Sequence, residues 1–430
     1  MKTFSKIVRL TFISTILFSF DTFATDTVKQ LTINDCIKLS LEQNTDIIIA
    51  HEDQKIAKAQ TTSAWSTVCP KLTIETDYAK IHSKQLHDTI DSFAVKLSAQ
   101  QLVWGGQVMP VLEAANYALN LADDSFLVKK NTVILIAKET YINVLKTEEL
   151  VKSARENKKL IEQIITQTES LISAGLATRA DLLKLQLQLK NIEQMVINTD
   201  NGAKVAKQSL NLLLGFPIDQ SIELKPYKTT DYNELLNLNT KELVTKALTQ
   251  RKELSQLDYS VKLLNTQAAV INSATQPVVL FSGNYGLIND KLSFDVGRDK
   301  DWLLALVAKW TFFDANDTQS KVDVNRSSIK KLQELRKQLV NGIELEVNII
   351  VNGITSSIAK IDASQKELEL AKENVSIAEE KYINGLGTNL DIIDSQTSLL
   401  AAQTNLINAN YDLEIAKARL YKAIGEMDKI

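Results

Sequence analysis

The feature that most constrains this chain is one short motif that occurs twice at a fixed spacing. The first copy runs from Gly175 to Leu183 and the second from Gly385 to Ile393. Both copies have the form Gly-Leu-x-Thr-x-x-Asp, and their first residues are 385 − 175 = 210 positions apart. The same offset of 210 separates Gly215 from Gly425. The chain is therefore an internal duplication.

Each copy of the motif predicts the end of one helix followed at once by the start of another. A glycine takes the left-handed conformation that ends a helix without a Cβ penalty. A threonine three residues later can cap the next helix, and the aspartate after it completes a capping-box-like pair. These residues are Gly175, Thr178 and Asp181 in the first copy and Gly385, Thr388 and Asp391 in the second.

Long helices are predicted on both sides of each motif. The 430 residues include only 13 Gly and 5 Pro, which favours long helices over many turns. Apolar and small residues recur at alternating steps of four and three, as in a coiled-coil seam, from Ile343 to Tyr382 and from Ile392 to Leu420. The first half has the same pattern between Ile134 and Val196. Helical hairpins are thus expected at about 114–215 and 317–425.

Each half starts with a further helical stretch that stops at a proline. These stretches cover 31–68 and 238–276 and end before Pro70 and Pro277, an offset of 277 − 70 = 207. After each proline the apolar period changes from about 3.6 to 2, which predicts strands at about 71–104 and 278–313. Polar loops at 80–91 and 289–301 would join the strands of each pair.

The predicted strands suit either a membrane barrel or a soluble two-sided hairpin. Alternating apolar and polar residues over about ten positions are typical of strands with lipid on one side and water on the other. Aromatic residues near the strand ends favour the membrane, where such residues form belts: Tyr78, Trp104, Tyr285, Trp302 and Trp310.

Residues 1–24 have the pattern of a cleaved secretory signal. A basic start is followed by a mostly apolar run from Leu10 to Phe20, which is short for a membrane anchor, and by a small-residue cleavage site ending at Ala24. Removal leaves 49 − 3 = 46 basic and 52 − 1 = 51 acidic residues. No basic field for nucleic acid is present, and no later run is apolar enough to predict a membrane-spanning helix.

The sequence predicts no enzyme, cofactor or metal site. The three histidines include His82 and His87 in a predicted outer loop, where solvated residues are favoured over a metal site. Gly105 and Gly106 lack a phosphate-loop pattern and predict a turn. Cys36 and Cys69 are expected to be free thiols, because 33 residues of one helix would hold them roughly 50 Å apart.

The repeated order of helix, proline, two strands, long helix, tip motif and long helix resembles the TolC family of outer-membrane efflux proteins. The resemblance covers Leu31 to Gly425. It implies a mainly α fold with a β-barrel part, in which duplicated coiled-coil hairpins and four strands per chain form a trimeric 12-stranded outer-membrane barrel and a periplasmic α-helical tunnel. Four strands cannot close a barrel, and lipid does not tolerate open edges, so the chain is expected to oligomerise. The expected parts are the signal 1–24, a first repeat 25–225 and a second repeat 226–430, joined by a polar linker from Pro217 to Asn239.

The resemblance implies a passive exit duct of a tripartite efflux pump or a type I secretion system. Its implied partners are a periplasmic adaptor, an inner-membrane transporter and outer-membrane lipid, in the envelope of a Gram-negative cell. The alternative is an exported coiled-coil adaptor or structural protein, against which the duplicated strand pairs argue. The cargo, small molecules or polypeptides, is not specified by the sequence.

The resemblance also implies which tip residues act. Gating and pore-constricting positions of the family fall on Asp181, Tyr382, Asp391 and Asp394, and Asp394 lies three residues after Asp391. The best-known member has an arginine two residues after the second tip glycine, whereas this chain has Gly387 there. The surface that docks an adaptor falls on Gly175, Leu176, Thr178, Gly385, Leu386 and Thr388.

Overall fold

The computed structural model describes residues 29–83, 88–226, 235–289 and 299–427. The predicted signal at 1–24 lies outside these residues. The first half contains β1 (Lys29–Leu31), α1 (Ile33–Gln43), α2 (Thr45–Trp65), β2 (Lys71–Ser83), β3 (Asp88–Gly105), α3 (Val108–Ser173), α4 (Arg179–Leu213) and β4 (Ile222–Leu224). The second half contains α5 (Thr240–Gln250), α6 (Lys252–Asn272), β5 (Val278–Asn289), β6 (Asp299–Lys309), α7 (Asp317–Ile383) and α8 (Asn389–Ala423).

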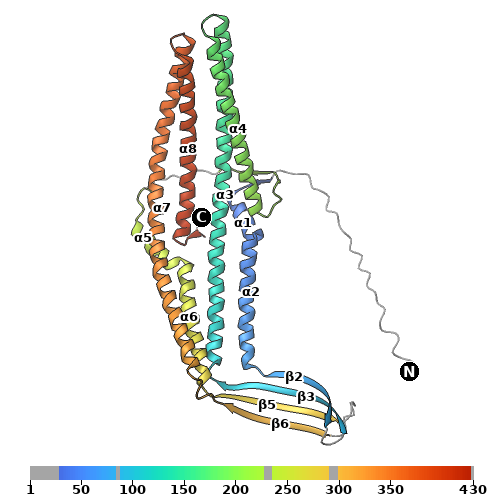
Figure 1. The fold of residues 1–430 in the computed structure, drawn as a ribbon. Coiled ribbons are helices and arrows are strands. Elements are labelled where there is room, and N and C mark those ends of the chain that lie inside the picture. Colours follow the sequence, from blue (N-terminus) through green and yellow to red (C-terminus); the bar gives the residue numbers. More distant parts are fainter. Residues whose placement is uncertain (1–28, 84–87, 227–234, 290–298, 428–430) are drawn as a thin grey trace, which may run out of the picture.

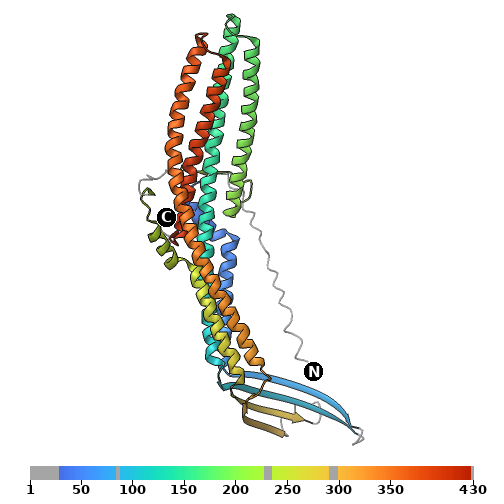
Figure 2. The same cartoon turned by 60° about the vertical axis from the view of Figure 1, so that its left-hand side comes forward.

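The molecule is elongated, with the two hairpin tips at one end and the sheet at the other (Figure 1). Helices α3 and α7 run nearly the whole way between these ends (Figure 2). They contain 66 and 67 residues, which corresponds to about 100 Å each at 1.5 Å per residue. The predicted mainly helical fold with two long hairpins and four longer strands is confirmed.

The predicted coiled-coil seams form the core of the helical part. Ile343, Val347, Ile354 and Ile361 of α7 are each at most 2 % exposed. They belong to one buried cluster with residues of α5, α6 and α8, so burial at steps of four and three joins α7 to the other helices of the second half. Because α3 also packs against α8 and α6, the two halves form one body rather than two separate rods.

The first helix of each half is broken, which corrects the prediction of one continuous helix from 31 to 68. Asn44 has an extended backbone, with φ −67° and ψ 126°, and its side chain accepts a hydrogen bond from the Asp46 amide at 2.9 Å. The second half breaks in the same way at Arg251, 207 residues later, with φ −69° and ψ 122°. A residue that leaves the helical region ends one helix and starts the next, and neither break needs a proline or glycine.

Both cysteines are free in the structure, although the single helix used to predict this is absent. Cys36 is fully buried and Cys69 is exposed. Burial raises the pKa of the Cys36 thiol to about 12. Since the thiolate is the reactive form, burial and the raised pKa both disfavour reaction of this side chain at neutral pH.

The four longer strands form one antiparallel sheet in the order β2-β3-β5-β6. Strand β3 pairs with β5, so the sheet joins the two halves. The predicted loops were too long, because β2 extends to Ser83, β3 starts at Asp88 and β6 starts at Asp299. His82 therefore lies in a strand rather than a loop, and His87 lies outside the described residues. Large apolar side chains project from the sheet into open space: Leu72, Ile74, Leu304 and Leu306 are each at least 61 % exposed.

Strand β6 ends at Lys309, earlier than predicted, so Trp310 and Phe312 lie in the turn that leads into α7. The Trp310 indole donates a hydrogen bond to the Thr275 carbonyl at 3.0 Å, which ties this turn to the end of α6. Phe312 and Phe313 are 81 % and 77 % exposed. Such exposed aromatic residues at one end of an apolar sheet are typical of a membrane interface.

A two-stranded parallel sheet, which the sequence did not predict, lies beside the middle of the helices. Strand β1 pairs with β4, in part of what was expected to be a linker. The buried Tyr141 hydroxyl of α3 donates to the Lys225 carbonyl at 2.7 Å, and the Leu31 carbonyl lies 3.2 Å away. This small sheet therefore fastens the start of the first half to its end.

Candidate gate and docking tips

The two tips have the same backbone. Gly175 and Gly385 have φ of +76° and +71°, in the left-handed region predicted for a helix end. The Leu176 amide donates to the Leu171 carbonyl at 2.8 Å, and the Leu386 amide donates to the Lys381 carbonyl at the same distance. Each long helix thus ends in a Schellman motif, which satisfies carbonyls that would otherwise lack partners.

Both predicted capping boxes are present. The Thr178 hydroxyl lies 2.7 Å from an Asp181 carboxylate oxygen, and Thr388 and Asp391 make the same contact at 2.7 Å. These hydroxyl hydrogen bonds are the main reason that the pKa of each aspartate is lowered. The carboxylates are therefore held at the positive ends of α4 and α8, where the helix dipole favours them.

Tyr382 lies between the hairpins rather than on the surface. It is 7 % exposed, and its hydroxyl is 3.0 Å from the hydroxyl of Thr168 on α3. Thr168, which is fully buried, donates to the Ile164 carbonyl at 2.9 Å. The second tip is thereby held against the first by a buried hydrogen bond within one chain.

Asp394 is exposed and lies one turn beyond the capped Asp391. The corresponding residue of the first tip, 210 positions earlier, is Lys184. The two tips therefore carry opposite charges at a matched position, and only the second tip brings two carboxylates together.

Gly387 sits tightly against the last turn of α7. A Cβ added there would lie 3.0 Å from the Lys381 Cβ and 3.2 Å from the Tyr382 amide nitrogen. The corresponding residue of the first tip is Ala177. Because Gly387 has no side chain, the second turn can approach α7 closely. The arginine that the resemblance places at this position is absent.

Asn389, the first residue of α8, is a tip residue that sequence analysis missed. Its side chain is 2 % exposed and donates to the backbone carbonyl of Asp181 at 2.7 Å. The contact joins residues 208 positions apart. No local pattern marks it, since Asn at this place in a sequence predicts only a helix start.

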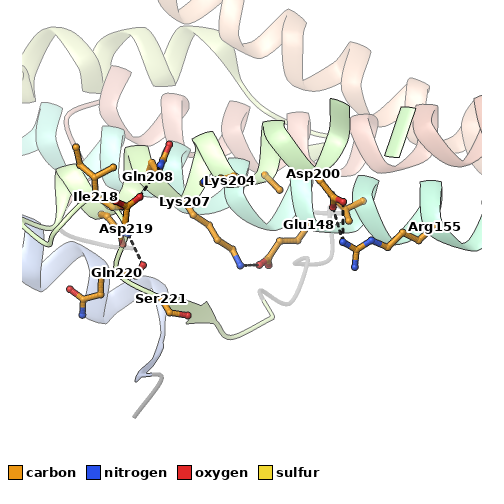
Figure 3. A pocket seen from close by; sticks show the side chains of 13 residues that line it. Glu148, Arg155, Asp200, Lys204, Lys207, Gln208, Ile218, Asp219, Gln220 and Ser221 are labelled. Carbon is orange, nitrogen blue, oxygen red and sulfur yellow. Dashed lines mark hydrogen bonds and ion pairs between the residues drawn. The ribbon is translucent and has the colours of Figure 1, made fainter. Parts of the chain in front are cut away.

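A separate groove of about 530 Å³ lies between α3, α4 and the turn that precedes β4 (Figure 3). Its charged side chains pair mostly with one another, since Arg155 binds Asp200 at 2.8 Å and Lys207 binds Glu148 at 2.7 Å. These pairs connect α3 to α4 well away from the tips. The groove therefore serves the packing of the first hairpin.

Neither a membrane-spanning helix nor a metal-binding cluster lies within the described ranges. No helix in them has the length and apolar character needed to cross a membrane. No group of three or more His, Cys, Asp or Glu side chains in them could hold a metal ion.

Paired helical hairpins with matched tips, joined to a sheet that exposes apolar side chains, are the features expected of an outer-membrane channel protein. Residues 36–216 and 243–426 match the family model described as outer membrane efflux protein. The chain belongs to this family. The two matched segments follow the duplication, one in each half.

Particular relatives agree with this assignment. The outer membrane protein TolC of Escherichia coli (strain K12) is 22 % identical over 399 residues, which cover 88 % of this chain and 78 % of that protein. The pyoverdine export outer membrane protein OpmQ of Pseudomonas aeruginosa is 21 % identical over 359 residues, covering 83 % and 74 %. The crystal structure of the Campylobacter jejuni CmeC outer membrane channel superposes with a TM-score of 0.83 at 15 % identity, covering 95 % of this chain and 90 % of that one.

The chain is therefore an exit duct of the outer membrane in a Gram-negative envelope, with its helical part in the periplasm. Members of this family are transport channels. The alternative of an exported adaptor or structural rod is not supported, because the family match extends through both halves and includes the strands.

Proposed function

We propose that three copies of this chain form one duct, with a 12-stranded barrel and a continuous helical tunnel. The observation that carries the proposal is that both sides of the subunit are unfinished. The sheet ends in the unpaired edges of β2 and β6, and lipid does not tolerate open strand edges. Three copies supply twelve strands, a number that can close into a barrel.

The outer helices support the same arrangement. The large apolar side chains that α4 exposes, except Met195, lie within about 80° of one another around the helix axis, at 100° per residue. Helix α7 lies on the opposite side of the subunit (Figure 1). It exposes a similar stripe between Leu345 and Ile377. A neighbouring copy that placed its α7 against α4 would cover both stripes. The stripes consist of Leu183, Leu187, Ile197, Val205 and Leu212 on α4, and Leu345, Ile349, Leu370 and Ile377 on α7.

Mass measurement in mild detergent tests this assembly. Three chains per particle are expected, in the outer-membrane fraction. A stable monomer or dimer would contradict the architecture. The proposed mature chain lacks residues 1–24 and consists of the repeats 25–225 and 226–430.

The tips form the proposed periplasmic gate and docking surface. Asp391 and Asp394 of three copies would place six carboxylates around the opening, favouring cations, with Asp181 and Tyr382 beside them. The small and apolar surface at Gly175, Leu176, Gly385 and Leu386, next to the caps Thr178 and Thr388, would receive a periplasmic adaptor. Leu176 and Leu386 support this role because they are 67 % and 82 % exposed.

The duct would act passively, with an inner-membrane transporter and its adaptor supplying energy and opening the tips. Small molecules or polypeptides would pass outward, as in a tripartite efflux pump or a type I secretion system. Deletion of the gene should abolish export by one inner-membrane transporter, and expression of the intact chain should restore it. Export that continues unchanged in the deletion strain would contradict this role.

A further inference from the structure

The duplication relates contacts within one chain to contacts between neighbouring chains. Helices α7 and α8 correspond to α3 and α4 with an offset of 210 residues. In a closed ring of identical copies, the second half of one chain lies beside the first half of the next. The two halves of a chain are similar, so first and second halves alternate around such a ring. Each contact between the two halves of one chain is then expected to have a counterpart between the second half of that chain and the first half of its neighbour. This reasoning rests on the trimer proposed above.

The relevant contact within the chain is the one that Asn389 makes. Its buried amide, on the first turn of α8, donates to the Asp181 carbonyl on the first turn of α4 at 2.7 Å. The two tips have the same turns and capping boxes, so the first turns of α4 and α8 can exchange places with little change in backbone.

Shifting both residues by one repeat gives the counterpart. Asn389 corresponds to Arg179, since 389 − 210 = 179, and Asp181 corresponds to Asp391, since 181 + 210 = 391. We propose that Arg179 of one copy binds the first turn of α8 in the neighbouring copy, at the Asp391 carbonyl and the carboxylates beside it. Around the ring of tips, the neutral contact between Asn389 and Asp181 within each chain would then alternate with an ionic contact between Arg179 and the neighbouring chain.

The surroundings of Arg179 support this assignment independently of the offset. The Arg179 side chain is exposed and makes no hydrogen bond or ion pair within the described part of the chain. It is the first residue of α4, where the helix dipole disfavours a cation. A cation placed against this local preference, with no side-chain partner among the described residues, fits a contact with another copy.

The charges of the two tips are complementary. Residues 166–187 contain two cations and two anions, a net charge of zero. The matching residues 376–397 contain one cation and four anions, a net charge of −3. A guanidinium group offers five N–H donors in a planar fork, so it can bind a carbonyl and a carboxylate together.

Cross-linking in native membranes tests the contact. In a Cys69→Ser background, Arg179→Cys with Asp391→Cys should give covalent dimers and trimers after a short bifunctional maleimide is added. The matched control is Asn389→Cys with Asp181→Cys, which loses the corresponding capping aspartate but should link only within a chain. Each single-cysteine variant should stay monomeric on a denaturing gel.

The outcomes separate the link from the assembly on which it rests. A trimer by mass that gives no covalent oligomers from the 179–391 pair would contradict the Arg179 link alone. A chain that is monomeric by mass before labelling would contradict the proposed trimer, and the link with it. Oligomers from the 389–181 pair would mean that the alternation of the two links is wrong.

Planar-bilayer conductance tests whether the link holds the gate closed. Arg179→Gln should raise the open fraction about tenfold, the scale of one lost hydrogen bond to a charged group. Arg179→Lys keeps the charge and should have a smaller effect. Lys184→Gln removes the same charge from the same helix and should conduct like the wild type. Equal increases for Arg179→Gln and Lys184→Gln would overturn the specific role of Arg179.

Discussion

The two tips share one backbone but not one set of side chains. Gly175 and Gly385, the Schellman hydrogen bonds and the capping boxes agree closely in geometry. The side chains around them differ at matched positions, where Ile172, Arg179 and Lys184 of the first tip correspond to Tyr382, Asn389 and Asp394 of the second. Turn geometry thus depends on a few glycine and cap residues, and the neighbouring positions were free to diverge.

The second tip supplies the larger side chains in the two contacts between the tips described above. Tyr382 and Asn389, which join the tips, both belong to the second hairpin and reach towards α3 or α4. Their partners in the first hairpin are a threonine hydroxyl and a backbone carbonyl. The second tip therefore provides the specific contacts, while the first provides the surface on which it rests.

The largest expected effect comes from substituting the glycine that both tips have at the helix end. Gly175→Arg and Gly385→Arg should each abolish transport, because a bulky cation would stand in the proposed docking surface. The positive φ of both glycines strains any residue that has a Cβ, by about 1–2 kcal/mol, but no atom lies within 4 Å of the added Cβ, so the trimer and its membrane insertion should remain intact. Gly175→Ala and Gly385→Ala are the matched controls, since they carry the same backbone strain without the bulky cation. Gly202→Arg adds the cation at an equally open position within α4. Export assays and outer-membrane fractionation measure the two outcomes, and transport that survives at one tip would show that the tips dock unequally.

The next effect concerns a contact that only the second tip makes. Tyr382→Ala should destabilise the closed tips by about 3 kcal/mol, as expected for removing a buried aromatic side chain. Tyr382→Phe removes only the hydrogen bond to Thr168 and should cost about 1 kcal/mol. Thermal unfolding of the detergent-solubilised protein, followed by far-ultraviolet circular dichroism, gives the order of the variants. Equal costs for the two variants would mean that the hydroxyl, not the ring, holds the tips together.

A smaller effect should separate the opposite charges at Asp394 and Lys184. Asp394→Ala should reduce cation selectivity and block by multivalent cations in planar-bilayer recordings, with little change in thermal stability. Lys184→Ala should preserve cation selectivity. Wild-type selectivity in Asp394→Ala would exclude the proposed ring of carboxylates.

The smallest expected effect should be the same at both tips. Thr178→Ala and Thr388→Ala should each weaken one capping box by about 1 kcal/mol. The pKa of Asp181 and of Asp391 is lowered in the folded protein, so each box contributes fully above the ordinary carboxyl pKa of about 4 and loses its contribution as pH falls through the lowered value. Amide hydrogen exchange of the two tips against pH measures both. Unequal protection of the two tips would show that packing, rather than capping, dominates one of them.

Local signals made much of this molecule predictable. The tip turns follow from glycine, threonine and aspartate at fixed steps, and the buried seam follows from the period of α7. The position of the strands followed from Pro70 and Pro277. All of these depend on residues close together in sequence, which is why a single sequence sufficed.

Contacts between distant segments were not predictable. The breaks at Asn44 and Arg251 involve residues that are tolerated inside helices, so only packing decides that the chain bends there. Strands β1 and β4 are three residues long and carry no readable alternation. Asn389 binds the Asp181 carbonyl because the first turn of α8 lies beside the first turn of α4. No short sequence pattern predicts that proximity.

The pairing of β1 with β4 also sets an order of events during biogenesis. Lys29 pairs with Ile222, so the beginning of the chain has no strand partner until the polypeptide has emerged as far as residue 224. From that moment the first half can close upon itself, as loop closure over such a length costs only slightly more than over a shorter one. Strand β3 has no partner on its second edge until β5 has been made, and an unpaired strand edge can pair with other chains and aggregate. The interval in which this edge is unpaired therefore runs from the closure of the first half to the arrival of Val278–Asn289.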